Sequence, residues 1–311
     1  MNLHNLDSAV TPLPQQVRTL DVGDGMRLAL NQTGDSAAAL TVLYVHGLLS
    51  GTDFWGPLTE LLHPQIGSRA TQLAFDARGH GRSGWPHRRA KTDFSVLADD
   101  LAHVVDSIRG PIVLVAHGIG SFVVLEHARR HPRQVHARLA EVVLFAAAGE
   151  EYEGEALRAF KPAAAGVRWM RHRGLLDNVN AAGHRYLSQR LCTLATHAKP
   201  GLAQLIPSQS PVDPRVTADL CTHCTTYRLH ETTVRTLATS RVRLITAEFD
   251  TLVPATQPQQ LADRLPGARV EHVAGAGHSL PLTNPQLAAP AILSAVNRLA
   301  RPIPAAAGSQ R

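Results

Sequence analysis

Between residues 40 and 145 the sequence alternates short apolar runs with longer amphipathic stretches. The short runs are apolar on both faces, which is typical of strands covered by helices on both sides: 40–45, 71–75, 111–116 and 141–145. The stretches between them have helical spacing: 54–63, 94–109 and 119–131. Alternating strands and helices of this kind predict a parallel sheet with helices on both faces.

Further segments extend this sheet at both ends. Before it, two short strand patterns flank the turn Gly23-Asp24-Gly25, which is typical of a β-hairpin: 17–22 and 26–30. Near the end of the chain, two strands and a closing helix are expected: 242–247, 269–273 and 285–300. The fold class is therefore predicted to be α/β, with a mostly parallel eight-stranded sheet flanked by helices.

Residues 149–238 interrupt the alternation. They carry Arg, His and Ala at helical spacing, several prolines and no convincing buried strand. Such an insertion after the sixth strand predicts a helical cap over the carboxyl edge of the sheet. The expected organisation is a flexible start, a first part of the core, the cap, a second part of the core and a flexible tail: 1–16, 17–148, 149–238, 239–300 and 301–311.

Composition places the chain among globular proteins, because 44% of its 311 residues are apolar and 18% are charged. The longest apolar run, Val142–Ala148, is far shorter than the ~20 residues that a membrane span needs. The first residues also lack a basic region followed by an apolar run. We therefore expect a cytoplasmic protein without a membrane partner.

The net charge of +6 is carried almost entirely by arginine. Two explanations are open: a coding bias of GC-rich genomes, or an anionic partner, since the planar guanidinium matches carboxylate and phosphate. Basic clusters at 88–91 and 168–173 would suit an anionic or carrier-linked substrate. No nucleic-acid-binding motif accompanies them, so no nucleic-acid partner is expected. A homodimer remains an open alternative.

The three cysteines do not predict a metal site. Cys221 and Cys224 would share one face of a helix that starts at Asp213-Pro214, while His223 points elsewhere. No second Cys-x-x-Cys pair completes four zinc ligands, so buried thiols are the favoured interpretation. Gly118-Ile119-Gly120 lacks the third glycine and the acidic residue of a dinucleotide fingerprint. We therefore expect no cofactor.

Distinctive residues follow four of the predicted strands, at the edge where open α/β sheets bind ligands. They are HGLLSG at 46–51, DARGHGRS at 76–83, EFDTLVP at 248–254 and GAGHS at 275–279. In this order and at these spacings they resemble the α/β-hydrolase fold superfamily, in its capped forms such as esterases and epoxide hydrolases. The resemblance covers about residues 17–300.

The resemblance implies a role for three of these residues. The backbone N–H of Leu48 matches one arm of an oxyanion hole, Asp250 matches the acid of the catalytic triad and His278 matches its base. The chemistry is consistent, because an Asp that holds one imidazole nitrogen fixes the tautomer and leaves the other nitrogen as a base. We expect the two side chains to hydrogen-bond directly and to face the turn at Gly118.

The nucleophile position departs from the family pattern. The family carries its nucleophile in a G-x-S-x-G turn after the fifth strand, and here that turn reads Ala116-His117-Gly118-Ile119-Gly120. Gly118 therefore stands where the nucleophile belongs, and it has no side chain with which to attack. An acyl-enzyme at this position is excluded, and Ile119 N–H is left as the second expected oxyanion donor.

Three interpretations of this site are open. The first is an enzyme that uses His278 and the oxyanion hole without a covalent nucleophile, as a cyclase, lyase, isomerase or water-mediated hydrolase, which would fit secondary metabolism. The second is a serine esterase or thioesterase whose nucleophile has been replaced. The third is a non-catalytic protein that binds small molecules. Retention of both Asp250 and His278 favours the first.

The expected substrate is a hydrophobic small molecule, since the predicted cap is rich in apolar side chains. The residues expected to line its site are His46, Gly47, His117, Trp55, Trp169, Met170 and Tyr186.

Overall fold

The computed structural model of the chain describes residues 15–87, 90–150, 152, 154–176, 179, 182–183, 186–187, 189–190 and 211–300. Several predicted features lie outside the described residues: most of the flexible start at 1–16, the flexible tail at 301–311, the arginines at 88–89, and Cys192. Within the described part, no helix has both the length and the apolar character that crossing a membrane requires.

The described residues form one eight-stranded sheet, as the sequence predicts. Its strands are β1 (Gln15–Asp21), β2 (Arg27–Thr33), β3 (Leu40–Val45), β4 (Ala70–Phe75), β5 (Ile112–His117), β6 (Leu139–Phe145), β7 (Arg241–Ala247) and β8 (Arg269–Val273). Their order across the sheet is β1-β2-β4-β3-β5-β6-β7-β8. Only the pairs β1–β2 and β2–β4 are antiparallel among these strands, so the predicted α/β class and the mostly parallel sheet are confirmed.

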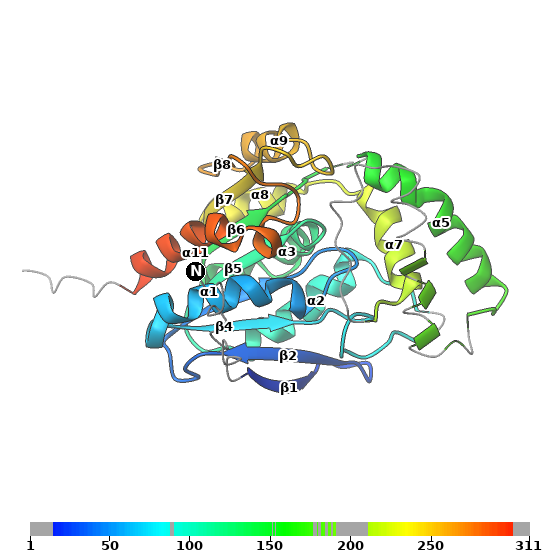
Figure 1. Ribbon diagram of the computed structural model, residues 1–311, viewed down its shortest axis with the longest axis horizontal. Coiled ribbons are helices and arrows are strands. Elements are labelled where there is room, and N and C mark those ends of the chain that lie inside the picture. Colours follow the sequence, from blue (N-terminus) through cyan, green and yellow to red (C-terminus); the bar gives the residue numbers. More distant parts are fainter. Residues whose placement is uncertain are drawn as a thin grey trace, which may run out of the picture.

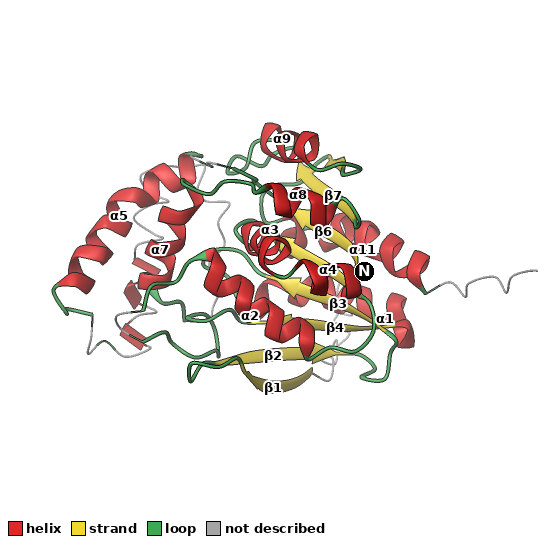
Figure 2. Cartoon of the chain, turned by 180° about the vertical axis from the view of Figure 1, so that it is seen from behind, coloured by secondary structure: helices red, strands yellow, loops and turns green. Residues whose placement is uncertain are grey.

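Helices cover both faces of the sheet (Figures 1 and 2). One face carries α1 (Gly56–Ile66), α10 (Leu280–Thr283) and α11 (Pro285–Leu299). The other carries α2 (Phe94–Asp106), α3 (Gly120–Arg130), α4 (Pro132–Arg138), α8 (Glu231–Leu237) and α9 (Thr256–Arg264). Two short 3-10 turns, η1 (Thr52–Trp55) and η2 (Gly67–Arg69), flank α1.

Strand β3 shows why the sheet is apolar on both faces. All six of its residues are buried. Val42 and Tyr44 belong to the hydrophobic cluster beneath α1 and α11, whereas Leu43 and Val45 belong to the cluster beneath α2 and α3. Because alternate side chains of a strand point to opposite faces, an unbroken apolar run is what such a central strand requires.

Two helices of the predicted cap lie beyond the carboxyl ends of the parallel strands (Figure 1). These are α5 (Glu155–His172) and α7 (Pro214–Cys224), which pack against each other. The start of α7 is tied to the turn after β4, where Asp213 N–H donates to Gly79 O at 2.7 Å. The last helix of the predicted cap segment, α8, instead packs against α3 and α4 on the core. The extent of the cap as a separate domain stays a prediction.

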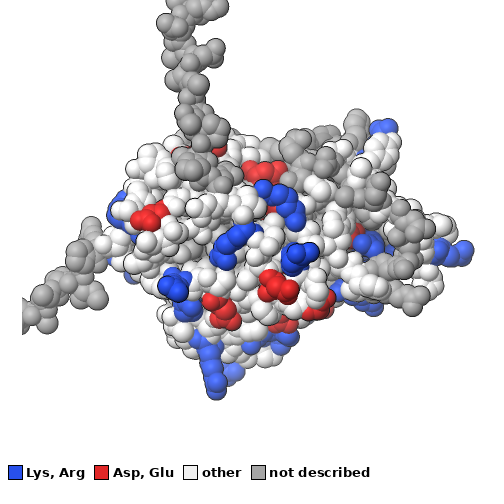
Figure 3. All heavy atoms as spheres, turned by 90° about the horizontal axis from the view of Figure 1, so that it is seen from below, with Lys and Arg blue, Asp and Glu red and all other residues white. Residues whose placement is uncertain are grey.

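Arginine serves inside this fold as well as on its surface. Arg78 holds the buried Asp100 through two nitrogen–oxygen contacts of 2.6 and 2.5 Å, and Arg243 holds Glu271 on the neighbouring strand through two of 2.6 Å. Such two-point pairing with a carboxylate is what arginine does better than lysine. On the face shown in Figure 3, basic and acidic side chains are interspersed rather than gathered by sign.

Candidate active site

The turn between β5 and α3 holds Gly118 in a left-handed conformation, with φ of +54°. A Cβ atom placed on Gly118 would lie 3.9 Å from Nε2 of His278, and no other heavy atom of the described residues, apart from the adjacent ones, would lie within 4 Å. The tight packing sits two residues further on, where a Cβ on Gly120 would lie 2.8 Å from the carbonyl oxygens of Val45 and His46. The turn therefore has the shape of a nucleophile elbow, with open space where the nucleophile would stand.

His278 and Asp250 meet as the sequence predicts. They follow β8 and β7 respectively, and Nδ1 of His278 donates to Oδ1 and Oδ2 of Asp250 at 3.1 and 3.0 Å. Asp250 Oδ1 also accepts the backbone N–H groups of Leu252 and Val253 at 2.9 and 2.8 Å. These bonds hold the ring of His278 so that its Nε2 faces Gly118.

The same contacts keep Asp250 ionised. Burial alone would raise the pKa of this carboxyl, but the hydrogen bonds and charge of His278 and the two backbone donors outweigh it, and the pKa is lowered from its ordinary value. Asp250 is thus a carboxylate held against the ring of His278.

Leu48 and Ile119 lie on the wall of the cavity above Gly118, one in the loop after β3 and the other in the elbow itself. Among the described residues, the backbone N–H of neither residue donates a hydrogen bond within the protein. Both groups are available to a ligand oxygen. Their assignment as an oxyanion hole stays a prediction.

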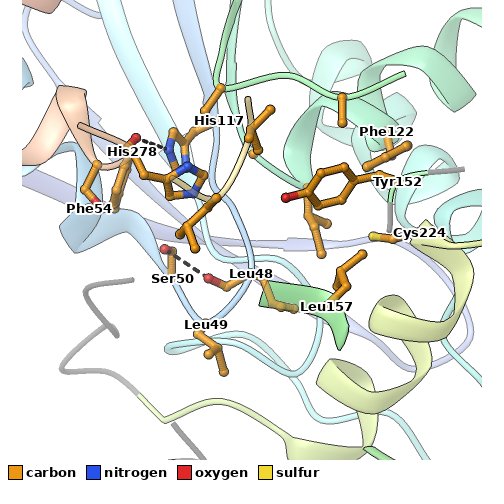
Figure 4. A pocket seen from close by; sticks show the side chains of 17 residues that line it. Leu48, Leu49, Ser50, Phe54, His117, Phe122, Tyr152, Leu157, Cys224 and His278 are labelled. Carbon is orange, nitrogen blue, oxygen red and sulfur yellow. Dashed lines mark hydrogen bonds between the residues drawn. The ribbon is translucent and has the colours of Figure 1, made fainter. Parts of the chain in front are cut away.

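The cavity beside Gly118 is small and mostly apolar (Figure 4). Its volume is about 60 Å³. Its lining comes from loops at the carboxyl ends of the strands and from α3, α5 and α7: Leu48, Leu49, Ser50, Phe54, His117, Gly118, Ile119, Phe122, Ala146, Ala148, Tyr152, Leu157, Cys224, Leu252, Val253, His278 and Ser279. A space of this kind suits a few carbon atoms rather than a long chain.

His117 lies at the cavity, whereas His46 lies inside the protein away from it. His117 lines the cavity, and its Nε2 donates to the carbonyl oxygen of His278 at 2.9 Å. Burial, reinforced by the neighbouring His278, lowers the pKa of His117 to about 3, so its ring is neutral. His46 accepts the N–H of Ala77 at Nε2 and borders, with Gly47, a separate small cavity. The structure thus brings only His117 of these three predicted lining residues to the site.

Trp55 does not reach the cavity, contrary to the expectation from sequence. Its side chain is 1% exposed and packs in the core against Tyr44, with ring centroids 5.0 Å apart. Its neighbour Phe54 takes the place at the cavity and lies 4.5 Å from the ring of His117. The 3-10 turn η1 is the reason, because adjacent residues of such a turn point in different directions.

The aromatic side chains predicted from the cap also lie elsewhere. Trp169 and Tyr186 are 55% and 61% exposed, and each ring faces an arginine, Arg173 and Arg190 respectively. Met170 packs on a cluster within the cap that includes Val167 of α5 and Ala218 of α7. The helical period of α5 turns Val167 toward α7 and leaves Trp169 facing outward.

The structure adds one polar cavity residue that the sequence did not indicate, Tyr152. It lies in the loop that follows β6. Its hydroxyl is turned toward the His278 side of the cavity (Figure 4).

Cys221 and Cys224 are buried on α7, as predicted, and burial raises the pKa of Cys221 to about 12. In the described part of the chain, no group of three or more His, Cys, Asp or Glu residues could hold a metal ion.

Comparison with known proteins identifies the family of the chain. The family model described as "Alpha/beta hydrolase family" matches residues 42–291. "Probable oxidoreductase EphD" of Mycobacterium bovis is 32% identical over 122 residues, 38% of this chain. The 2-(acetamidomethylene)succinate hydrolase of Mesorhizobium japonicum is 30% identical over 124 residues, 40% of this chain. The chain spans only 20% and 41% of the length of these two relatives.

Solved structures show the same fold over nearly the whole chain. An esterase from Thermogutta terrifontis superposes with a TM-score of 0.66 at 20% identity, covering 93% of this chain and 100% of that chain. At this identity the likeness establishes the fold alone.

Proposed function

The chain belongs to the alpha/beta hydrolase family, and on that premise we propose that it is an enzyme that hydrolyses a small hydrophobic carbonyl compound without a covalent nucleophile. In this proposal a water molecule occupies the space beside Gly118, and His278 is its base. Asp250 orients His278, and the backbone N–H groups of Leu48 and Ile119 receive the oxyanion.

One observation carries the proposal: the nucleophile position is intact in shape but empty of a side chain. The Cβ position of Gly118 is 3.9 Å from Nε2 of His278, and no other non-adjacent atom that the structure describes lies within 4 Å of it. A water oxygen in that space comes within the roughly 2.6–3.2 Å that proton transfer to a base needs. The hydrogen bonds of Asp250 and His117 hold the base in place for it.

The reaction then balances in two steps. Water attacks the substrate carbonyl carbon while its proton passes to Nε2 of His278, and the carbonyl oxygen becomes an oxyanion between Leu48 N–H and Ile119 N–H. The oxyanion collapses, the bond to the leaving group breaks, and the leaving group takes the proton from His278. The products are a carboxylic acid and an alcohol or amine, and His278 is again neutral.

The expected rate enhancement is moderate. A positioned base contributes about 10²–10⁴-fold and an oxyanion donor about 10²–10³-fold. The apolar lining favours a short hydrocarbon group beside the carbonyl. Hydrolase and esterase relatives are consistent with this chemistry, although their own substrates are not assigned to this chain.

Hydrolysis of small neutral esters tests the proposal. We expect the wild-type protein to hydrolyse 4-nitrophenyl acetate or butyrate, and His278→Gln to lower kcat/KM by about 10²–10⁴-fold. Tyr227→Phe is the matched control, since Tyr227 is buried behind Phe122 rather than at the cavity, and it should retain full activity.

The same assay separates the alternatives. If the wild-type protein is no faster than His278→Gln across a panel of small esters, the hydrolase proposal fails and the binding protein gains support. A substrate that loses a proton to His278 and gives a product without oxygen from the solvent would instead identify a lyase or cyclase.

A further inference from the structure

Tyr152 is a buried polar residue at the cavity that the proposed hydrolysis does not use. It lies between β6 and α5, is 7% exposed, and helps to form the wall of the cavity across from His278 (Figure 4). Its hydroxyl oxygen is shielded from solvent and, within the described residues, has no hydrogen-bond partner.

An unpartnered hydroxyl of this kind is costly to the folded protein. Leaving a buried donor without an acceptor lowers the folding equilibrium constant by about 5- to 150-fold. A phenylalanine would fill the same space without that cost. The hydroxyl therefore does not stabilise the ligand-free protein, and a role in binding would explain its presence.

The backbone two residues after Tyr152 leaves room for this hydroxyl. A Cβ atom on Gly154 would collide with the hydroxyl oxygen of Tyr152. The backbone angles of Gly154, φ of −57° and ψ of 161°, are open to any residue, so backbone strain does not account for glycine there. Gly154 instead leaves the space in which the tyrosine can stand.

The hydroxyl is also able to donate a hydrogen bond. Burial, with the negative charge of Asp250 nearby, raises the pKa of Tyr152 above its ordinary value, so the phenol keeps its proton. None of the described residues lining the cavity is Lys or Arg. An acceptor that binds there is therefore matched by a neutral donor and need not carry a charge.

We infer that the Tyr152 hydroxyl donates a hydrogen bond to a second oxygen of the substrate, across the cavity from the backbone donors of Leu48 and Ile119. This inference rests on the proposed function of the cavity. It narrows the substrate class to small, neutral, mostly apolar carbonyl compounds that carry a further acceptor oxygen, such as an ether, hydroxyl or second carbonyl. Tyr152 is then a specificity-determining residue.

Binding of two probes that differ in one oxygen tests the inference. Butanone has the carbonyl alone, whereas methoxyacetone adds an ether oxygen. We expect the wild-type protein to bind methoxyacetone about 5- to 10-fold more tightly than butanone, by NMR titration, in keeping with one net hydrogen bond. Tyr152→Phe should abolish this preference, and Tyr227→Phe should leave it unchanged.

Stability gives a second and opposite readout. Because the Tyr152 hydroxyl has no partner in the free protein, Tyr152→Phe should be at least as stable as wild type in urea, while it loses the binding preference. A Tyr152→Phe variant that keeps the preference, or one that is clearly destabilised as after loss of an internal hydrogen bond, overturns the inference.

Gly154→Ala provides an independent variant, since its methyl group displaces the hydroxyl and should also remove the preference. These experiments measure binding, so their results are independent of whether His278 catalyses hydrolysis.

Discussion

Replacing Gly118 with serine should create a covalent nucleophile in this chain. The Cβ atom of the new residue would lie 3.9 Å from Nε2 of His278, with no other non-adjacent heavy atom of the described part of the chain within 4 Å. The hydroxyl oxygen, one bond further out, then falls within the roughly 2.6–3.2 Å at which a base activates a nucleophile.

The cost of Gly118→Ser comes from the backbone. Gly118 has a φ of +54°, which glycine adopts freely but which costs other residues about 1–2 kcal/mol. For a chain of this size that loss lowers Tm by roughly 1.5–3 °C. The variant should therefore remain folded, and activity can be compared at 25 °C.

The assay is labelling by an aryl phosphonate, followed by intact-protein mass spectrometry. We expect one equivalent of label on Gly118→Ser and none on wild type, and a burst of nitrophenol from 4-nitrophenyl acetate in the variant alone. Gly118→Ser combined with His278→Gln should not be labelled. A folded Gly118→Ser variant that resists the phosphonate would refute the elbow geometry on which the account is built.

Three further outcomes are expected. Burial lowers the pKa of three histidines to about 3 or 4, namely His80, His117 and His127. As the pH falls, the unfolded chain therefore binds protons at these residues before the folded chain does. The free energy of unfolding should fall by up to about 4 kcal/mol per pH unit between pH 6 and 4.5, as measured by urea titrations. His127→Gln should lower this slope by about a third. Asp250→Asn should lower kcat by up to about 10⁴-fold, because it removes the carboxylate that fixes the tautomer and stabilises the imidazolium of His278, and unchanged kcat would contradict its role. Gly120→Ala should destabilise the protein by about 1–3 kcal/mol, because the new methyl group meets main-chain oxygens. Gly166→Ala, in open space on α5, should instead stabilise the protein by about 0.5–1 kcal/mol, as measured by chemical unfolding.

The sequence predicted the fold well because each strand carries its own pattern. The run 40–45 is apolar on both faces and forms β3 with the same bounds, and 269–273 forms β8. Boundaries near helix ends were less secure. The helix expected at 94–109 ends at Asp106, since the last turn closes on Ser107. The separate helix α4 was not predicted, although it begins at Pro132, which favours the first position of a helix.

Site residues were predictable from the sequence where the strand order sets their positions. They were less predictable where the direction of a side chain determines whether it reaches the cavity. His278 and Asp250 follow neighbouring strands, so their meeting follows from the order of the sheet. Whether Phe54 or Trp55 faces the cavity depends on a short 3-10 turn, which no apolar period reveals. Tyr152 was missed because a single tyrosine in a loop has no pattern that distinguishes a cavity residue from a surface one.

The claim that water replaces the nucleophile is tested most directly by the mass of the wild-type protein during turnover. A reaction with 4-nitrophenyl acetate in ¹⁸O-water is quenched in the steady state, and the masses of the protein and of the acetate are measured by mass spectrometry. The account predicts unmodified protein, acetate carrying one oxygen from the solvent, and product formation that His278→Gln abolishes. An acetyl group on the wild-type protein, or acetate formed no faster than without His278, would contradict it.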